Sequence, residues 1–302
     1  MKQIIRITIG LTISCLIAAF LMGAVFTITA KAKKQNEHRQ IQETMLELLG
    51  YHKGNSPPSD LKLRNIYRYV LDSDSGKYLG YMIPVKVQNG VGYKLLVMNL
   101  KGNFHNLIDL NIEPENVIES RERETALKEA LQPPLSSAYA GETVIATSGE
   151  KRVAYLVKGE FQGYKTFIHI MLALDPTFSV LGMEVMEHEE DPGLGGEIEE
   201  DYFKNQFENK TFEKLKELDV VKEPLPEEYR KYLEPELRQT LTRRNLESIK
   251  NKYQGSDIYA LTGATISSKA VTEGVKNAAM KFAYRMGTLD RVIAEQGVRA
   301  AF

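Results

Sequence analysis

The run from Ile7 to Ala30 constrains this chain most, because it contains no charged residue. At a rise of about 1.5 Å per residue, a helix of this length crosses a hydrocarbon core of about 30 Å. A cleaved signal peptide is the alternative, but its apolar region is normally shorter. A lipoprotein signal at Cys15 is disfavoured, because the apolar run continues well beyond it. The sequence therefore predicts a single-pass membrane anchor over residues 1–30, embedded in a lipid bilayer.

The charges that flank this run do not fix its orientation. By the positive-inside rule, the basic residues that follow the run mildly favour a cytoplasmic C-terminal bulk. A large domain can nevertheless be translocated despite such charges. The flanking residues are Lys2 and Arg6 before the run, and Lys31, Lys33, Lys34 and Arg39 after it.

The remaining chain predicts an α+β fold built on a mostly antiparallel sheet with packed helices. Residues 31–64 are expected to form a stalk helix, ended by Gly50, and a linker. An N-terminal α/β part is expected over 65–150, where short apolar or alternating runs indicate strands and residues 120–131 indicate a helix. The expected strands are Tyr67–Leu71, Gly80–Val87, Tyr93–Leu100 and Leu107–Ile112.

A second part is expected over residues 151–286, with a C-terminal tail over 287–302. Strands are expected at 143–147, 152–158, 166–174 and 180–187, and an amphipathic helix over 268–286. The strand runs that follow Gly92-Tyr93-Lys94 and Gly163-Tyr164-Lys165 resemble each other, which indicates a duplicated strand unit. A charged insertion over 216–255 is expected to be mainly solvated, or else to face a partner.

Composition narrows the function classes. Lys+Arg 39 against Asp+Glu 40 gives no reason to expect a nucleic-acid partner. The single cysteine, Cys15, rules out an intramolecular disulfide and a thiolate metal cluster. No catalytic triad or general acid/base pair is visible.

The stretch from Leu261 to Ser268 has a pattern typical of a strand, a turn and a helix start. Such a junction directs backbone N–H groups and the positive end of the helix dipole at an anion, which suits a phosphate. The alternative is an ordinary helix start with a serine as the N-cap. The hydroxyl-bearing candidates are Thr262, Thr265, Ser267 and Ser268.

The stretch from His188 to Glu200 is a loop rich in glycine and acidic residues. Its glycines allow close approach by a ligand. A metal site is disfavoured, because consecutive residues from His188 to Asp191 cannot all converge on one ion. A dinucleotide site is disfavoured too, because the glutamates Glu197, Glu199 and Glu200 would repel a pyrophosphate.

Together, the two stretches resemble the FMN-binding domain family. Thr262-Gly263-Ala264-Thr265 resembles its S/T-G-A-T flavinylation motif, and His188 to Ile198 resembles its H-x-E-T-P-G-L-G segment. Their order behind one membrane span is similar to the G-type subunit of Rnf ion-translocating electron-transport complexes. The C-type subunit of the sodium-translocating NADH:quinone reductase is the close alternative.

The resemblance implies that FMN is joined covalently through its phosphate to the hydroxyl of Thr265, as phosphothreonyl-FMN. A flavin transferase would form this bond. The resemblance places the glycine-rich loop beside the flavin. The other cofactor-binding residues that it implies are Thr262, Gly263, Ala264, Ser267, Ser268, Glu190, Pro192, Gly193, Leu194 and Gly195.

The chain departs from the family pattern at two positions. Tyr259 stands where the family usually has Asp, six positions before the acceptor threonine, and Asp257 lies two residues earlier. Asp191 stands where the family has Thr. A carboxylate close to the ring would disfavour the anionic reduced flavin and lower its potential.

The resemblance implies a flavoprotein that relays electrons in a membrane-bound, ion-translocating ferredoxin:NAD oxidoreductase, together with other membrane subunits. The chain would be a redox subunit and not a stand-alone enzyme. The resemblance also implies a location in the cytoplasmic membrane, with the soluble domain on the outer side. A membrane-anchored binding or sensor domain that holds no covalent ligand is the alternative from another class.

Overall fold

The computed structural model describes residues 2–52, 54–74, 76–88, 90–132 and 135–302. The chain forms two compact units, Met1–Glu47 and Leu48–Phe302. The first is occupied by helix α1 (Lys2–Leu48), whose Gln3–Ala30 part is long and apolar enough to cross a membrane by length and composition. The predicted anchor and stalk are therefore one continuous helix. Gly50, with φ of 85°, follows its end, as expected from the sequence.

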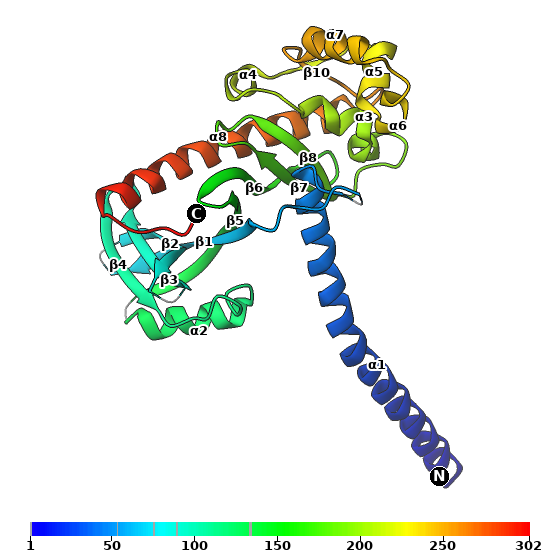
Figure 1. The fold of residues 1–302 in the computed structure, drawn as a ribbon. Coiled ribbons are helices and arrows are strands. Elements are labelled where there is room, and N and C mark those ends of the chain that lie inside the picture. The colour runs from blue at the N-terminus through cyan, green and yellow to red at the C-terminus, as the bar shows by residue number, and fades with distance from the viewer. Residues whose placement is uncertain (1, 53, 75, 89, 133–134) are drawn as a thin grey trace. The chain divides into compact units, whose positions relative to one another are not determined.

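The second unit is built on an antiparallel sheet of eight strands in the order β4-β3-β2-β1-β5-β6-β7-β8. This order is two four-stranded meanders, β1–β4 and β5–β8, joined by the pairing of β1 with β5 (Figure 1). The two sequence runs that resemble each other are the third and fourth strands of each meander. The strands are β1 (Leu61–Ser73), β2 (Gly76–Val87), β3 (Gly90–Asn99), β4 (Phe104–Leu110), β5 (Ser136–Ser148), β6 (Lys151–Gln162), β7 (Phe167–Leu174) and β8 (Val180–Glu187).

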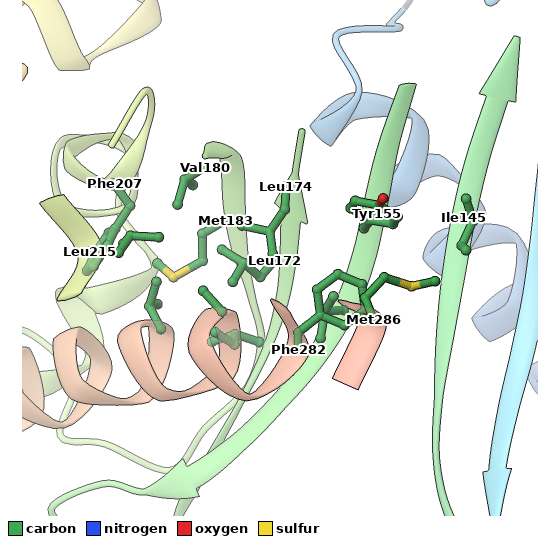
Figure 2. Packing of buried hydrophobic residues seen from close by; sticks show 14 of the residues in the cluster. Ile145, Tyr155, Leu172, Leu174, Val180, Met183, Phe207, Leu215, Phe282 and Met286 are labelled. Atoms are coloured by element: carbon green, nitrogen blue, oxygen red, sulfur yellow. The ribbon is translucent and has the colours of Figure 1, made fainter. Parts of the chain in front are cut away.

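One face of the sheet packs against the long C-terminal helix α8 (Thr265–Glu295). Apolar residues of both meanders meet the apolar side of this helix, and Figure 2 shows Phe282 and Met286 lying toward Tyr155 and Leu172. Phe282 packs edge-on against Tyr155, with 5.1 Å between ring centroids. This core fixes α8, and hence its first residue, relative to the sheet.

The opposite face of the first meander is covered by helix α2 (Ser120–Ala130). Leu127 of this helix is fully buried among Tyr67, Leu71 and Leu95 of the sheet. The alternation of side chains along β1 sends Ile66 to the α8 face and Tyr67 to the α2 face, as strand geometry requires. The fold is the α+β architecture that the sequence predicts.

The α8 helix differs from the prediction at both ends. It begins at Thr265 and not near Ser268, and it continues to Glu295 because Leu289, Val292 and Ile293 extend its buried side. The last residues then return to the sheet, where the N–H of Lys86 donates to the carbonyl of Arg299 at 2.8 Å.

Between β8 and α8 the chain forms short elements with a small core of their own. The charged insertion is therefore only partly a solvated surface, because Tyr229 and Tyr253 stack within it with 4.3 Å between ring centroids. The elements are η1 (Gly195–Glu199), α3 (Asp201–Lys204), η2 (Asn205–Phe207), α4 (Phe212–Glu217), β9 (Val220–Val221), α5 (Glu227–Leu233), α6 (Pro235–Arg238), α7 (Arg243–Tyr253) and β10 (Ile258–Tyr259).

Candidate cofactor site

The turn that follows β10 places Thr265 at the first position of α8. Ala264 is the N-cap residue and makes no side-chain cap hydrogen bond, so the alternative of a serine N-cap is wrong. Gly263 has φ of 78°, a conformation that glycine adopts without strain, and it lets the chain reverse into the helix. Leu261 and Ala264 are buried and anchor the turn in the core.

Ser268 holds this turn in shape. Its side chain is fully buried, its hydroxyl donates to the carbonyl of Ala264 at 2.9 Å, and it accepts from the N–H of Leu261 at 3.0 Å. Both hydroxyl functions are thus used within the protein. Ser268 positions the neighbouring residues and leaves Thr265 as a partly exposed hydroxyl at the helix start.

The carboxylate of Glu190 joins the glycine-rich loop to two other segments. It is 4% exposed, and its Oε1 accepts from the N–H groups of Tyr164 at 2.8 Å and Lys165 at 3.1 Å. Its Oε2 accepts from the hydroxyl of Ser267. One side chain therefore fixes the turn before β7, the loop after β8 and the first turn of α8 relative to one another.

Glycines let the loop and the helix start approach closely. A Cβ atom on Gly195 would lie 2.7 Å from Oγ of Ser267 and 2.8 Å from Oε2 of Glu190. A Cβ atom on Gly263 would lie 3.2 Å from Cδ2 of Leu194. The two sequence motifs, far apart in the chain, are thus in direct contact.

A pocket of about 370 Å³ opens between these motifs. It includes seven of the residues expected from the sequence, which are Glu190, Leu194, Gly195, Gly263, Ala264, Thr265 and Ser267. Thr262, Ser268, Pro192 and Gly193 are not among its lining residues. Three further residues line it that the sequence did not assign to a site, Tyr164, Asp191 and Ile266. The resemblance between the two Gly-Tyr-Lys turns already pointed to Tyr164, but as part of a strand unit.

Asp191 is paired at the edge of the pocket with Lys165. The hydrogen bond from Lys165 to this carboxylate raises the pKa of the lysine, which stays charged at neutral pH. The carboxylate that replaces the family threonine is therefore partly neutralised. The lowering of a bound flavin's potential expected from an isolated Asp191 is correspondingly weaker.

Neither residue of interest upstream of the motif lines the pocket. Tyr259 packs in the tyrosine core, 6.1 Å from the ring centroid of Tyr229, and its backbone N–H donates to Gln206 at 2.8 Å. Asp257 accepts from Nζ of Lys214 at 2.7 Å. Both therefore support the insertion and the short strand that lead into the turn.

The pocket residues fit a phosphate-bearing ligand. The first N–H groups of a helix have no acceptor within it, and they carry the positive end of the helix dipole. At the start of α8 these groups lie beside the hydroxyl-bearing Thr265, while glycines keep the approach open. Exposed Tyr164, Leu194 and Ile266 add aromatic and apolar surface suited to a flat ring system.

Comparison with known proteins agrees with this chemistry. Residues 163–280 match the family described as the FMN-binding domain. The G-type subunit of the proton-translocating ferredoxin:NAD(+) oxidoreductase complex of Clostridium ljungdahlii is 35% identical over 133 residues, which cover 44% of this chain and 55% of that protein. The G-type subunit of the ion-translocating oxidoreductase complex of Pasteurella multocida is 39% identical over 56 residues, which cover 18% of this chain and 28% of that protein.

The chain thus spans 55% of the first relative and 28% of the second. The crystal structure of NqrC from Shewanella oneidensis matches 72% of this chain and 77% of that one, with 16% identity and a TM-score of 0.38. A likeness this weak carries no argument about function. The matched family segment contains both motifs and all residues of the pocket. Residues 163–280 of this chain are therefore an FMN-binding domain, and the pocket at the start of α8 is its candidate FMN site.

Proposed function

We propose that this chain is an electron-carrying subunit of a membrane-bound, ion-translocating ferredoxin:NAD oxidoreductase of the Rnf type, with FMN joined covalently to Thr265. The observation that supports this most is the pocket itself, which brings Thr265 at the start of α8 against the loop that carries Glu190 and Gly195. The names of the two curated relatives support the choice of complex.

The attachment is a phosphoryl transfer without a change of oxidation state. A bond forms between Oγ1 of Thr265 and the phosphorus of a flavin nucleotide. The threonine hydroxyl loses its proton, and the bond from phosphorus to the nucleotide's leaving group breaks. A flavin transferase would catalyse this step. Once bound, FMN supplies reversible electron uptake and release, while the chain supplies position and electrostatics.

The surroundings of the pocket are suited to contact with other subunits. Leu194 is 46% exposed, Ile266 62% and Tyr164 60%. Exposed apolar side chains gathered at one opening are typical of surfaces that a partner covers. We therefore propose that neighbouring subunits dock at this opening and exchange electrons there.

Covalent attachment is tested by expressing the full chain with a flavin transferase and examining the denatured protein by ultraviolet fluorescence in a gel. Wild type and Thr262→Ala are expected to give a fluorescent band, since Thr262 does not line the pocket. Thr265→Ala is expected to give none. Mass spectrometry should place FMN less one water on the peptide that contains Thr265.

Two results would contradict covalent attachment at Thr265. One is a fluorescent band that persists in Thr265→Ala. The other is a wild-type chain without a band, when the same transferase modifies a second substrate in the same cells.

The side of the membrane is tested with a single new cysteine at the exposed position Glu236 in α6. A membrane-impermeant maleimide should label Glu236→Cys in intact spheroplasts, because we propose that the domain lies on the outer side. Labelling only in inverted vesicles would place the domain in the cytoplasm. Wild type, whose single cysteine is Cys15 within the apolar run, is the control.

A further inference from the structure

The sheet is divided where its two meanders diverge. Strand β5 pairs with β6 only from Thr143↔Val157 to Ser148↔Lys151, although β5 begins at Ser136 and β6 continues to Gln162. The first half of β5 stays paired with β1, and the second half of β6 stays paired with β7. The two strands therefore separate beyond Thr143 and leave a cleft between them.

Helix α8 closes one side of this cleft. A cavity of about 400 Å³ lies between its second half and the diverging strands. This volume is within the range of small-molecule sites, about 300–1,000 Å³. The cavity shares no lining residue with the pocket around Thr265. It is a separate candidate site.

The inner wall of the cavity is apolar. Ile66 and Val157 contribute from the sheet, and Phe282, Met286 and Leu289 from α8. All five are buried members of the main core. Their side chains offer a surface for an aliphatic or aromatic body, which is the usual lining of a ligand pocket.

The polar groups of the cavity leave two guanidinium groups without a counter-charge. Lys158 is paired with Glu142, and His169 lies 3.7 Å from Glu160. For Arg68 and Arg285, in contrast, no carboxylate lies within ion-pair distance in the described part of the chain. Both guanidinium groups are partly buried on the cavity lining.

Each of the two arginines is held in place by a backbone carbonyl. Nη2 of Arg68 donates to the carbonyl of Ala140 at 2.6 Å, and Nε of Arg285 donates to that of Lys281 at 3.0 Å. Gly141, beside Ala140, has φ of 134° and leaves room for Arg68, since its missing Cβ would lie 3.5 Å from Nη2. A guanidinium carries five N–H donors, so both arginines retain N–H groups for an anion. Guanidinium is also the side chain best matched to carboxylate or phosphate.

We propose that this cleft binds an amphipathic anion, whose apolar or aromatic body packs on Val157, Phe282 and Met286 and whose carboxylate or phosphate is bound by Arg68 and Arg285. The ligand joins the two meanders across the line at which their strand pairing stops. This site is independent of the FMN site and of the function proposed for it.

The proposal is tested with the full chain in nanodiscs of neutral lipid, with 2-naphthoate as the probe and empty nanodiscs as the blank. Binding is measured by isothermal titration calorimetry. 2-Naphthylmethanol carries the same ring without the charge, and acetate carries the charge without the ring. Each is expected to bind at least about tenfold more weakly than 2-naphthoate, because each loses one of the two kinds of contact. 2-Naphthyl phosphate distinguishes a preference for phosphate from one for carboxylate.

Arg68→Gln and Arg285→Gln should each weaken 2-naphthoate binding by about tenfold or more, because each removes a charge-assisted contact. Arg243→Gln is the matched control, since Arg243 is exposed on α7 and does not line the cavity. Met286→Trp fills the cavity and should abolish binding without removing a charge.

Hydrogen exchange locates the site independently of any variant. 2-Naphthoate should slow exchange in residues 139–143 and 158–160, and Thr265→Ala should leave this protection unchanged. The proposal is overturned if 2-naphthoate does not bind to wild type, if it binds no better than 2-naphthylmethanol, or if both arginine variants, shown to be folded by circular dichroism, bind it like wild type.

Discussion

At the scale of single residues, Glu190 is the side chain on which the site geometry depends most. It is a buried carboxylate with three hydrogen-bond donors from two other segments. A buried charge is tolerated only when such donors satisfy it. Its role is therefore positional, because it holds Ser267 and the start of α8 against the loop.

Glu190→Ala is expected to lower the free energy of unfolding by about 1–3 kcal/mol, because it leaves buried donors unsatisfied. It should also reduce FMN incorporation, because the loop no longer meets the helix start. Chemical denaturation and the flavin-to-protein absorbance ratio measure the two effects. Glu189→Ala, at the exposed neighbouring position, should stay within about 0.5 kcal/mol of wild type. Equal effects from both changes would contradict the positional role.

Gly195 provides a second residue-scale prediction. Gly195→Ala places a methyl group 2.7 Å from Oγ of Ser267, so the loop must move away from the helix start. We expect a loss of about 1–3 kcal/mol in unfolding free energy and less FMN incorporation than in wild type. Gly255→Ala is the matched control, because a Cβ atom there meets nothing within 4 Å and φ is not positive. A Gly195→Ala chain that loads FMN as wild type does would show that the close approach is unnecessary.

At the scale of elements, helix α8 offers two glycines in opposite situations. A Cβ atom on Gly274 would lie 2.2 Å from Cδ1 of Phe161, whereas one on Gly287 would meet nothing within 4 Å. The first glycine therefore allows close packing of the helix on β6. The second has only the intrinsic cost of glycine in a helix.

Two alanine substitutions on α8 should consequently change stability in opposite directions. Gly287→Ala is expected to raise the free energy of unfolding by about 0.5–1 kcal/mol through helix propensity. Gly274→Ala is expected to lower it by about 1–3 kcal/mol, because Phe161 or the helix must shift. Thermal and urea denaturation of both variants measure the sign. Stabilisation by Gly274→Ala would mean that α8 does not pack on β6 as described.

The short elements before α8 are tied together by the buried Lys210. Its ammonium group donates to the carbonyls of Tyr253, Gln254 and Ser256, the last at 2.6 Å. Burial, together with the charge of Lys214, lowers the pKa of Lys210 to about 8. The folded state therefore releases this proton at lower pH than the unfolded chain, for which the reference value is 10.5.

The sign of the pH dependence follows from linkage. Between pH 8 and pH 10.5 the unfolded state binds more protons than the folded state, so stability due to Lys210 rises with pH. We expect the unfolding free energy of wild type to gain on that of Lys210→Met across this window, by up to about 1.4 kcal/mol per pH unit. Urea denaturation at several pH values measures the difference. Lys222→Met removes an exposed lysine as the control. A difference that stays flat or falls with pH would contradict the lowered pKa.

At the scale of the whole molecule, the unit Leu48–Phe302 contains both sheet faces, their cores and the FMN site. Among the residues that the structure describes, helix α1 supplies none that line the site. The predicted membrane anchor and the folded unit are thus separate in their structural requirements.

A chain that begins at Leu48 is expected to remain in the supernatant after ultracentrifugation and to incorporate FMN at the level of the full chain. Its melting temperature should be the same within a few degrees, because the described part of α1 contributes nothing to the two main cores. The full chain should sediment with membranes. Loss of FMN incorporation by a shortened chain that still melts cooperatively would show that the anchor is required for maturation.

The sequence alone determined the elements and the identity of the site motifs. Its alternating runs correctly predicted the strands of both meanders, since period-two patterning reports burial on one face of a sheet. The Thr262–Thr265 and His188–Ile198 segments pointed to FMN by resemblance. Helix ends were less certain. The start of α8 at Thr265 was missed, because Leu261 and Ala264 are held by tertiary packing and no side chain caps the helix.

Only the tertiary structure decided which residues meet. Glu190 contacts Ser267, Tyr164 faces the same pocket, and Asp191 is paired with Lys165, although no spacing in the sequence predicts these contacts. The cleft at Arg68 and Arg285 is likewise invisible in the sequence, because it exists where strand pairing stops. The physical reason is the same in each case. Local patterns fix the conformation and the buried side of a segment, whereas contacts between distant segments depend on how the core packs them together.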